Sequence, residues 1–577
     1  MITFSGQISF LHLMPLDWNN TNPSLIDNAA IAIIRLPAQV NVTDLRYGGA
    51  ILINPGGPGE SGVLQALNSA QSFQTIFDAA YINGSDSYLS NNTDAKYFDI
   101  IGFDPRGVNN STPFVSCFAT ESEYLSWSLQ TQNQLGTPEG PYDLLWQQNV
   151  ALNNECFVDP MITPNGTLIT DFITTASTAR DMVEIIERHG EWREQQTTDS
   201  EDQQRIAWQK GEEPILYYGV SYGTILGATL ATMQPHRVNR MILDGVASSS
   251  QYYAGNFTTD NVDRDATFEL FFEYCALAGP ENCTMWAGNS SDATKQVLVD
   301  ISNNLTRNGP LAVAGQDGVG ATVITLSALK NIVGSPQFLY APLTGFPTFA
   351  NVVGPLYVGN GTFLAQALYS PLPPIPLNDT IDPYDPSTGP NYFAPQLLQG
   401  TATSALVGSD STTRRTEEQY KAVWDELRNV STWNGDHLAT LYMFISSWPG
   451  APKWRYGDTQ PIASNVTANP ILFASNVIDP ATSLASAREM NAAFAGSGLL
   501  LNDGEGHTTA VAPSLCVVKK FREYFQTGKL PFGLDETCLP YVRPFLGEAG
   551  PRTAPFNPEG ASLEDLALFN ASLSYTG

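Results

Sequence analysis

The chain is poor in charged residues, and poorest in basic ones. Only 15% of its 577 residues are charged, and 28 Lys and Arg stand against 57 Asp and Glu, which gives a formal net charge of −29. Such a surface repels phosphate backbones and anionic lipid heads, so we expect no nucleic-acid partner and no membrane-surface partner. No apolar run approaches the roughly 20 residues that span a bilayer, so no membrane-spanning segment is expected either. A hydrophobic fraction of 42% indicates a folded globular protein rather than a disordered or fibrous chain.

Cysteine is also scarce, and its spacing argues against a zinc site. The six cysteines form no Cys-x-x-Cys pair and no Cys/His cluster with zinc spacing, so the sequence predicts three disulfides and no metal. Proximity along the chain favours the first two of the following pairs and leaves the third: Cys275–Cys283, Cys516–Cys538 and Cys117–Cys156.

Asn-x-Ser/Thr sequons are, by contrast, abundant. There are 16 of them, where chance would give roughly six, and the excess predicts a secreted glycoprotein. The first residues, Met-Ile-Thr-Phe-Ser-Gly, lack the basic and apolar regions of a signal peptide. Either a signal is absent from this sequence or the protein is intracellular and the excess accidental; we favour the first. The sequons lie at Asn19, Asn41, Asn83, Asn91, Asn109, Asn110, Asn165, Asn256, Asn282, Asn289, Asn304, Asn360, Asn378, Asn429, Asn465 and Asn570.

The pattern of apolar runs predicts one interrupted sheet. Short strand-like runs alternate with helical patterns up to residue 246, which favours a mainly parallel sheet with helices on both faces. Residues 247–456 change to aromatic helical segments and Pro/Gly-rich connectors, and strand-like runs then return. We therefore predict an α/β core (1–246 and 457–577) with a mostly helical cap (247–456) inserted after its sixth strand. The strands expected are 29–36, 49–54, 97–103, 214–220, 240–243, 470–475 and 498–501.

The strongest chemical signal is the G-x-S-x-G pattern at residues 219–223. It follows the apolar run PILYY and opens a helix rich in small residues, which is the context of a nucleophile elbow. We predict that Ser221 is a nucleophile and that the backbone N–H of Tyr222 faces a developing oxyanion. An ordinary Gly-rich turn between a strand and a helix is the alternative.

A serine hydroxyl needs a base, and the chain has only five histidines. If the order is serine, acid, histidine, as in α/β-hydrolases, only His437 and His507 remain. His507 follows the apolar run GLLLN in a Gly-rich loop, whereas His437 lies within a helical pattern. His507 is therefore the predicted base, with an exposed loop histidine as the alternative.

The acid is expected where the preceding strand ends. Asp479 follows the run PILFAS and precedes His507 by 28 residues, which accommodates one helix and one strand. It would hold the imidazole in one tautomer and stabilise the imidazolium. Asp244 ends the strand after the nucleophile helix and is the rival acid, although a turn or capping role is more usual there. Asp503 and Glu505 are interpreted as loop charges.

A second oxyanion donor is predicted from the segment NPGGPGESG, residues 54–62. Its consecutive glycines let backbone N–H groups face a substrate with no Cβ in the way, and Gly57 is the predicted donor.

Together, the segments NPGGPGESG, GFDPRGVNNSTP, GVSYG, IDPATSLASA and GEGH resemble the prolyl/tripeptidyl aminopeptidase family of α/β-hydrolase serine peptidases. Residues 479–538 resemble that family's tripeptidyl-aminopeptidase-like C-terminal region. The resemblance implies Ser221 as nucleophile, Asp479 as acid and His507 as base, with oxyanion donors at Gly57 and Tyr222. It implies a secreted enzyme without metal or organic cofactor that removes short peptides or single residues from free N-termini.

Two further residues are candidates for substrate binding. An aminopeptidase must bind a substrate ammonium, and Glu60, where many relatives have glycine, is a candidate carboxylate; a solvated loop charge is the alternative. Arg106 in the DPRG segment would be a structural or pocket-forming arginine. We therefore predict a serine hydrolase acting on a peptide through an acyl-enzyme on Ser221. The alternatives are a carboxylesterase or lipase-like enzyme that cleaves a small ester with the same triad, and a non-catalytic binding protein on a hydrolase scaffold.

Overall fold

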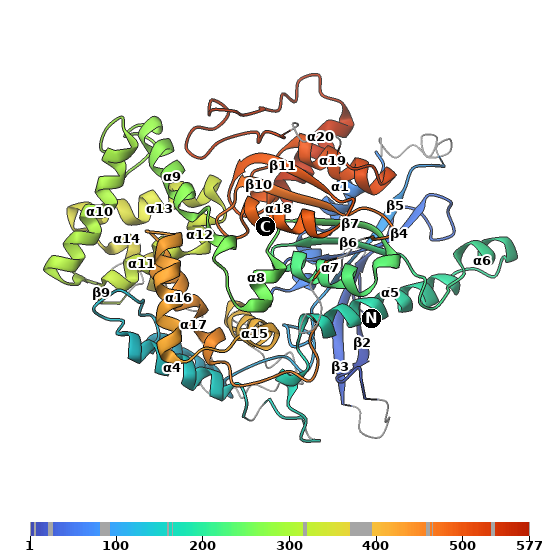
Figure 1. Cartoon of the computed structure of the whole chain (residues 1–577). Coiled ribbons are helices and arrows are strands. Elements are labelled where there is room, and N and C mark those ends of the chain that lie inside the picture. Colours follow the sequence, from blue (N-terminus) through green and yellow to red (C-terminus); the bar gives the residue numbers. More distant parts are fainter. Residues whose placement is uncertain are drawn as a thin grey trace.

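A twisted, mainly parallel β-sheet forms the centre of the molecule in the computed structural model (Figure 1). Its nine strands follow the order β1-β2-β3-β5-β4-β6-β7-β10-β11. Strands β4 to β7, β10 and β11 pair in parallel, while β1, β2 and β3 add an antiparallel edge. The structure describes residues 2–4, 7–20, 27–80, 93–158, 161–163, 165–315, 320–369, 395–456, 462–463, 466–531 and 537–575.

The strand boundaries agree closely with the runs expected from the sequence. In this sheet, the N-terminal pair β1 and β2 was not anticipated. The strands are β1 (Ile2–Phe4), β2 (Gln7–Pro15), β3 (Asn28–Leu36), β4 (Tyr47–Asn54), β5 (Tyr97–Phe103), β6 (Ile215–Val220), β7 (Val238–Asp244), β10 (Leu472–Ile478) and β11 (Gly498–Glu505).

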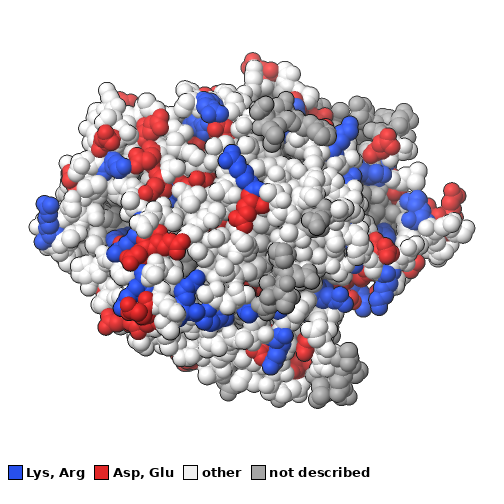
Figure 2. All heavy atoms as spheres, in the orientation of Figure 1, with Lys and Arg blue, Asp and Glu red and all other residues white. Residues whose placement is uncertain are grey.

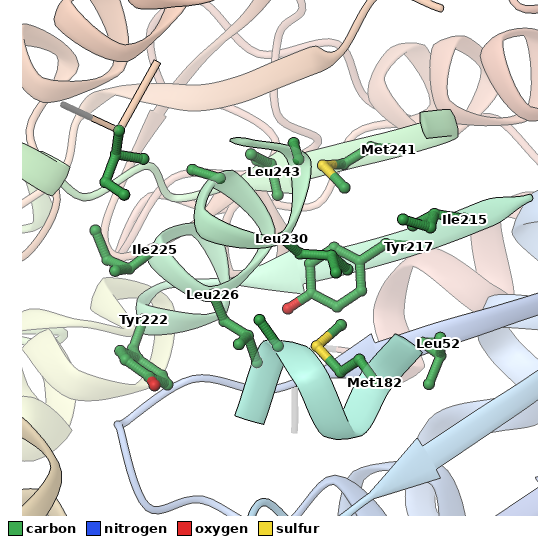
Figure 3. Packing of buried hydrophobic residues seen from close by; sticks show 14 of the residues in the cluster. Leu52, Met182, Ile215, Tyr217, Tyr222, Ile225, Leu226, Leu230, Met241 and Leu243 are labelled. Atoms are coloured by element: carbon green, nitrogen blue, oxygen red, sulfur yellow. The ribbon is translucent and has the colours of Figure 1, made fainter. Parts of the chain in front are cut away.

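Helices cover both faces of this sheet because its central strands are apolar on both sides. All seven residues of β5 are buried, as the sequence of a doubly covered strand requires. One face is covered by α1 (Gly62–Phe77), α19 (Leu515–Thr527) and α20 (Leu563–Ser574). The other is covered by α5 (Thr175–Glu194), α7 (Tyr222–Met233) and α18 (Leu484–Ala493). In Figure 3, Leu226 and Leu230 of α7 and Met182 of α5 meet Tyr217 of β6.

A mostly helical cap lies between β7 and β10, and the chain then returns to the sheet. Strand β10 pairs in parallel with β7, so the insertion follows the sixth strand if the short β1 is not counted. The division of the chain at residues 246 and 456 stays a prediction. The cap contains α8 (Ser249–Ala254), α9 (Arg264–Ala278), α10 (Ser291–Asn308), a hairpin of β8 (Leu311–Val313) and β9 (Thr322–Ile324), α11 (Leu326–Gly334), α12 (Pro336–Leu339), α13 (Pro342–Val353), α14 (Thr362–Tyr369), α15 (Pro395–Asp410), α16 (Glu417–Val430) and α17 (Gly435–Ser447).

The cap side also receives helices from the first part of the chain. Helix α4 (Tyr142–Glu155) packs beside α16 and α17, where Trp146 joins an apolar cluster with Tyr420 and Leu438 (Figure 1). It follows α3 (Glu121–Gln130), whereas α6 (Ser200–Ile206) comes later and lies away from the cap. A helix from before the cap in the sequence thus packs against it.

Three disulfides join the cysteine pairs that the sequence favours. Cys117–Cys156 links the segment after β5 to the end of α4, Cys275–Cys283 closes a short loop in the cap, and Cys516–Cys538 ties α19 to the chain beside β11. Disulfides of this kind persist in oxidising compartments.

The surface fits the sparse, scattered charge of the sequence. Figure 2 shows acidic and basic side chains in small mixed groups separated by wide uncharged areas. Among the described residues, no helix has the length and apolar character needed to span a bilayer. Four sequon asparagines, Asn83, Asn91, Asn378 and Asn465, lie outside the described residues; of the other twelve, nine are exposed and three are half-buried, so burial blocks none of them.

Candidate active site

Ser221 occupies a sharp turn between β6 and α7. Its backbone has φ +56° and ψ −123°, a conformation that non-glycine residues adopt only when the surroundings enforce it. The Ser221 N–H donates to the carbonyl of Asp244 at 3.0 Å, and its own carbonyl accepts from the Thr224 N–H at 2.8 Å. The strained turn is thus held from both sides, and it is the geometry of a nucleophile elbow.

The predicted oxyanion segment lies directly against this turn. A Cβ on Gly56 would lie 2.5 Å from the carbonyl oxygen of Val220, and one on Gly223 would lie 2.8 Å from the carbonyl oxygen of Asn54. The two glycines therefore let the chains approach more closely than side chains would allow. Gly57 is exposed within the same segment, so its N–H is available to a ligand.

His507 follows β11 and is paired with Asp479, which follows β10. The imidazole Nδ1 lies 3.1 Å from each carboxylate oxygen of Asp479. Asp479 is fully buried and accepts further bonds from the backbone N–H groups of Ala481, Thr482 and Thr508, each at 2.9 Å. These donors, added to the imidazole, fix the carboxylate in one orientation.

The two side chains shift each other's pKa in the directions expected of an ion pair. Burial raises the pKa of Asp479, but the charge and hydrogen bond of His507 outweigh it and hold the pKa below its usual value. Burial lowers the pKa of His507, but Asp479 outweighs it, with smaller contributions from Glu60 and Asp244, and the pKa is raised. A histidine in this position can accept a proton and hold it as an imidazolium.

The cap also contacts His507, through the segment between α12 and α13. The His507 N–H donates to the Tyr340 carbonyl at 2.8 Å, and the two rings meet edge to face with centroids 5.0 Å apart. A Cβ on Gly506 would lie 2.4 Å from Cδ of Pro342. The glycine before the histidine is thus required by the cap. No motif in the sequence pointed to Tyr340.

Ser221 and His507 line one cavity of about 910 Å³ at the junction of core and cap. Gly57 and Glu60 border it from the oxyanion segment, and Tyr340 borders it from the cap. Phe118, Tyr124 and Trp127 form an aromatic part of its wall. Among the described residues that line it, Glu60 is the single carboxylate and no Lys or Arg is present.

Comparison with known proteins agrees with this geometry. A family model described as "alpha/beta hydrolase fold" matches residues 49–282, and one described as "TAP-like protein" matches residues 434–538. The chain is an α/β-hydrolase with a TAP-like C-terminal region.

Three curated relatives of this hydrolase match different shares of its chain. A tripeptidyl aminopeptidase of Streptomyces lividans is 24% identical over 510 residues, which are 86% of this chain and 78% of that protein. The serine protease Hip1 of Mycobacterium tuberculosis is 29% identical over 334 residues, 57% of this chain and 52% of that protein. Carboxylesterase B of the same organism is 33% identical over 171 residues, 29% of this chain and 26% of that protein.

The rival acid, Asp244, forms its hydrogen bonds with residues of the hydrolase other than His507. Its carboxylate accepts from the Thr509 N–H at 2.9 Å, the Thr509 hydroxyl at 2.6 Å and the Tyr218 hydroxyl at 3.1 Å. Burial raises the pKa of Asp244 to about 6, and these bonds lower it only partly. Asp244 therefore holds the chain beyond His507 and not the imidazole itself.

The rival histidine, His437, is half-buried within α17. Burial, and then the charge of Arg264, lower its pKa to about 3, so the ring is neutral near pH 7. It packs against Gly334 of α11, where an added Cβ would meet the ring at 2.3 Å. His437 is thus a packing residue of the cap.

Arg106 is structural and does not line the cavity. Its guanidinium, only 1% exposed, forms an ion pair with Asp181 of α5 at 2.5 Å and donates to the carbonyls of Leu16 and Phe172. All of these partners lie in the fold of the core, so substrate binding by Arg106 has no support. Glu60 does border the cavity, as expected of a substrate-binding residue.

Asp503 and Glu505 are not solvated loop charges. Both are nearly buried and form ion pairs with Arg543 of the C-terminal segment. Separately, no group of three or more His, Cys, Asp or Glu side chains in the described part of the chain is placed to bind a metal ion.

Proposed function

We propose that this serine hydrolase of the tripeptidyl aminopeptidase and Hip1 family is a peptidase that acts on free N-termini through an acyl-enzyme on Ser221. The observation that carries the proposal is the His507–Asp479 pair on the same cavity as Ser221 and the oxyanion segment. The match to a tripeptidyl aminopeptidase over most of both chains supports a peptide substrate.

In the proposed mechanism, Nδ1 of His507 donates to Asp479, which leaves Nε2 to take the proton of the Ser221 hydroxyl. The Ser221 oxygen attacks the scissile carbonyl, and the N–H groups of Gly57 and Tyr222 stabilise the oxyanion. His507 then gives the proton to the leaving amine. Water resolves the acyl-enzyme by the same route and frees the Ser221 hydroxyl.

The Tyr222 donor is held in place by its own side chain. The Tyr222 and Thr175 hydroxyls are 2.6 Å apart, and Thr175 in turn donates to Asp410 of α15 at 2.5 Å. The cap therefore supports the proposed oxyanion site as well as His507.

Glu60 is proposed to bind the substrate ammonium. It is the carboxylate on the cavity wall, and its charge reaches His507. Replacing Glu60 by Gln should lower the ratio of kcat/KM for free over N-acetylated peptides roughly tenfold, because a charge-assisted hydrogen bond is lost. Glu418→Gln, on the exposed face of α16, is the matched control and should leave the ratio unchanged. An equal loss on free and acetylated peptides would contradict this role.

A paired assay tests the proposed activity. Free and N-blocked peptide anilides are compared with short- and long-chain nitrophenyl esters, using the wild-type protein and Ser221→Ala. We expect cleavage of free peptides only, and a loss of at least about 10⁴-fold in kcat in the variant, because the nucleophile is removed. A fluorophosphonate should label the wild type and not the variant. Full activity in Ser221→Ala would refute the mechanism, and failure to label would favour a binding protein.

Ester hydrolysis is the second candidate function. The relative named carboxylesterase B supports it over less than a third of the chain, and the aromatic wall of the cavity suits an acyl group as well as a side chain. Cleavage of esters with inert peptides in the same assay would favour this reading.

We also propose that the protein acts outside the cytoplasm as a glycoprotein. Three disulfides and an excess of sequons, none of them buried where described, support this location.

A further inference from the structure

An ionic cluster lies directly before the proposed catalytic histidine. Arg543 lies in the segment between α19 and α20. It binds Asp503 and Glu505, which are among the last residues of strand β11, shortly before His507. The Arg543 and Asp503 atoms are 3.1 Å apart, and Arg543 also pairs closely with Glu505. The side chain of Arg543 is 6% exposed, that of Asp503 is 11% exposed and that of Glu505 is 5% exposed. We call these three residues the Arg543 clamp.

The C-terminal segment is folded around this guanidinium. Arg543 Nε donates to the Pro551 carbonyl at 2.9 Å, and Nη2 donates to the Arg552 carbonyl at 3.1 Å. Phe545 and Arg552 have φ of +62° and +51°, a backbone conformation that surrounding contacts must hold. The loop therefore has one shape that presents Arg543 to β11.

The same loop contacts the cap. The ring of Phe545 lies 6.1 Å from that of Phe271 in α9, and both belong to the apolar cluster of the cap. Tyr274, one turn further along α9, faces the clamp: burial and then the charge of Glu505 raise its pKa. The clamp thus joins the cap, the C-terminal segment and the strand that carries His507.

The clamp also neutralises the carboxylate of Glu505, whose charged form is disfavoured by burial. Burial raises the pKa of Glu505 to about 7, and Arg543 is the group that opposes this shift. Removing one partner of a buried pair leaves an uncompensated charge, which must protonate or move toward water. Gly506 alone separates Glu505 from His507, so the clamp lies directly beside the histidine in the chain.

We propose that Arg543 is a positioning residue for His507, which it fixes by holding Asp503 and Glu505 at the end of β11. The proposal rests on the proposed role of His507 as base. A displacement of about 1 Å in a reacting group costs on the order of 10²-fold in rate. Arg543→Met should therefore lower kcat about 100-fold with KM changed less than about threefold, because the cavity wall is left intact.

Arg522→Met is the matched control. Arg522 is a similarly buried arginine, 9% exposed, that binds Glu564 of α20 and the Ile76 carbonyl of α1 and is not among the described residues that line the cavity. It should lower the melting temperature without lowering kcat per active site, counted by fluorophosphonate titration. Arg543→Lys, which keeps the charge but not the two-pronged contact, should recover about tenfold of the lost kcat.

Three outcomes decide the question. The proposal would be overturned if Arg543→Met and Arg522→Met had the same kcat. It would also be overturned if, in the double variant Arg543→Met with Glu505→Gln, kcat recovered only in proportion to the melting temperature. If Arg543→Met does not fold, Arg543→Lys and Glu505→Gln replace it, and a kcat at the wild-type level in both would be equally damaging. Ser221→Ala separates the two hypotheses: activity there refutes the mechanism, whereas normal kcat in the Arg543 variants refutes only the clamp.

Discussion

Two aspartates lie at the ends of neighbouring strands of the sheet, and their pKa values are shifted in opposite directions. Asp244 closes β7 and Asp479 follows β10, which pairs with β7, and both are fully buried. The pKa of Asp244 is raised to about 6 by burial, whereas the pKa of Asp479 is lowered against the same effect. Burial therefore does not distinguish them. The imidazole 3.1 Å from Asp479 does.

The two carboxylates also hold consecutive residues of one loop. Asp479 accepts the Thr508 N–H, and Asp244 accepts the Thr509 N–H, each at 2.9 Å. Both therefore shape the turn after His507, but only Asp479 reaches the ring. The comparison teaches that the acid of a triad is identified by its contact with the imidazole, since supporting the loop is common to both aspartates.

Replacing Asp479 by Asn tests the larger effect. The amide still fits the pocket but favours the wrong imidazole tautomer, so kcat should fall about 10⁴-fold while KM changes little. The measurement is steady-state kinetics on a free peptide anilide, with circular dichroism to show that the fold is kept. A loss under about tenfold would remove Asp479 from the triad.

Replacing Asp244 by Asn should change stability and leave kcat within about tenfold. Burial raises the pKa from 3.8 to about 6, so the folded protein holds this proton more tightly than the unfolded chain. The unfolding free energy of the wild type therefore falls as pH rises through this range. The full loss from this group is roughly 3 kcal/mol, of which about 2 kcal/mol falls between pH 4 and pH 6. In Asp244→Asn, residue 244 has no group that titrates between these pH values. The unfolding free energy of the variant should therefore fall less with rising pH than that of the wild type.

Denaturant unfolding of both proteins at pH 4 and pH 6 measures this difference, in which contributions from all other groups cancel. Equal falls would show that Asp244 is not protonated in the folded state. A loss of kcat as large as that of Asp479→Asn would instead make Asp244 the acid and reverse the comparison.

Much of the core could be predicted because its signals are local. Strand β5 coincides with the predicted range 97–103, and helix α7 begins directly after Ser221, where the sequence predicts a helix to open. Near-continuous apolar runs bounded by glycines suffice to locate such elements. The elbow was predictable for the same reason, because Gly219 and Gly223 flank Ser221 in the sequence.

What could not be predicted depends on contacts between distant segments. Tyr340 reaches His507 from the cap, and Arg543 reaches β11 from beyond α19; neither lies in a motif. The choice between a structural and a pocket-forming Arg106 could not be made for the same reason, since the motif around it says nothing of its partner Asp181, which is 75 residues away. Asp503 and Glu505 looked like loop charges because their partner comes some 40 residues later.

The return of the chain to the sheet after the cap has a consequence for biosynthesis. Ser221 leaves the ribosome about 290 residues ahead of His507, and the Arg543 clamp follows later still. At roughly 5–20 residues per second, the proposed base is synthesised about 15–60 s after the proposed nucleophile. If the proposed triad is correct, the nascent chain carries a serine that cannot cleave its neighbours until the segment with Asp479 and His507 has also emerged.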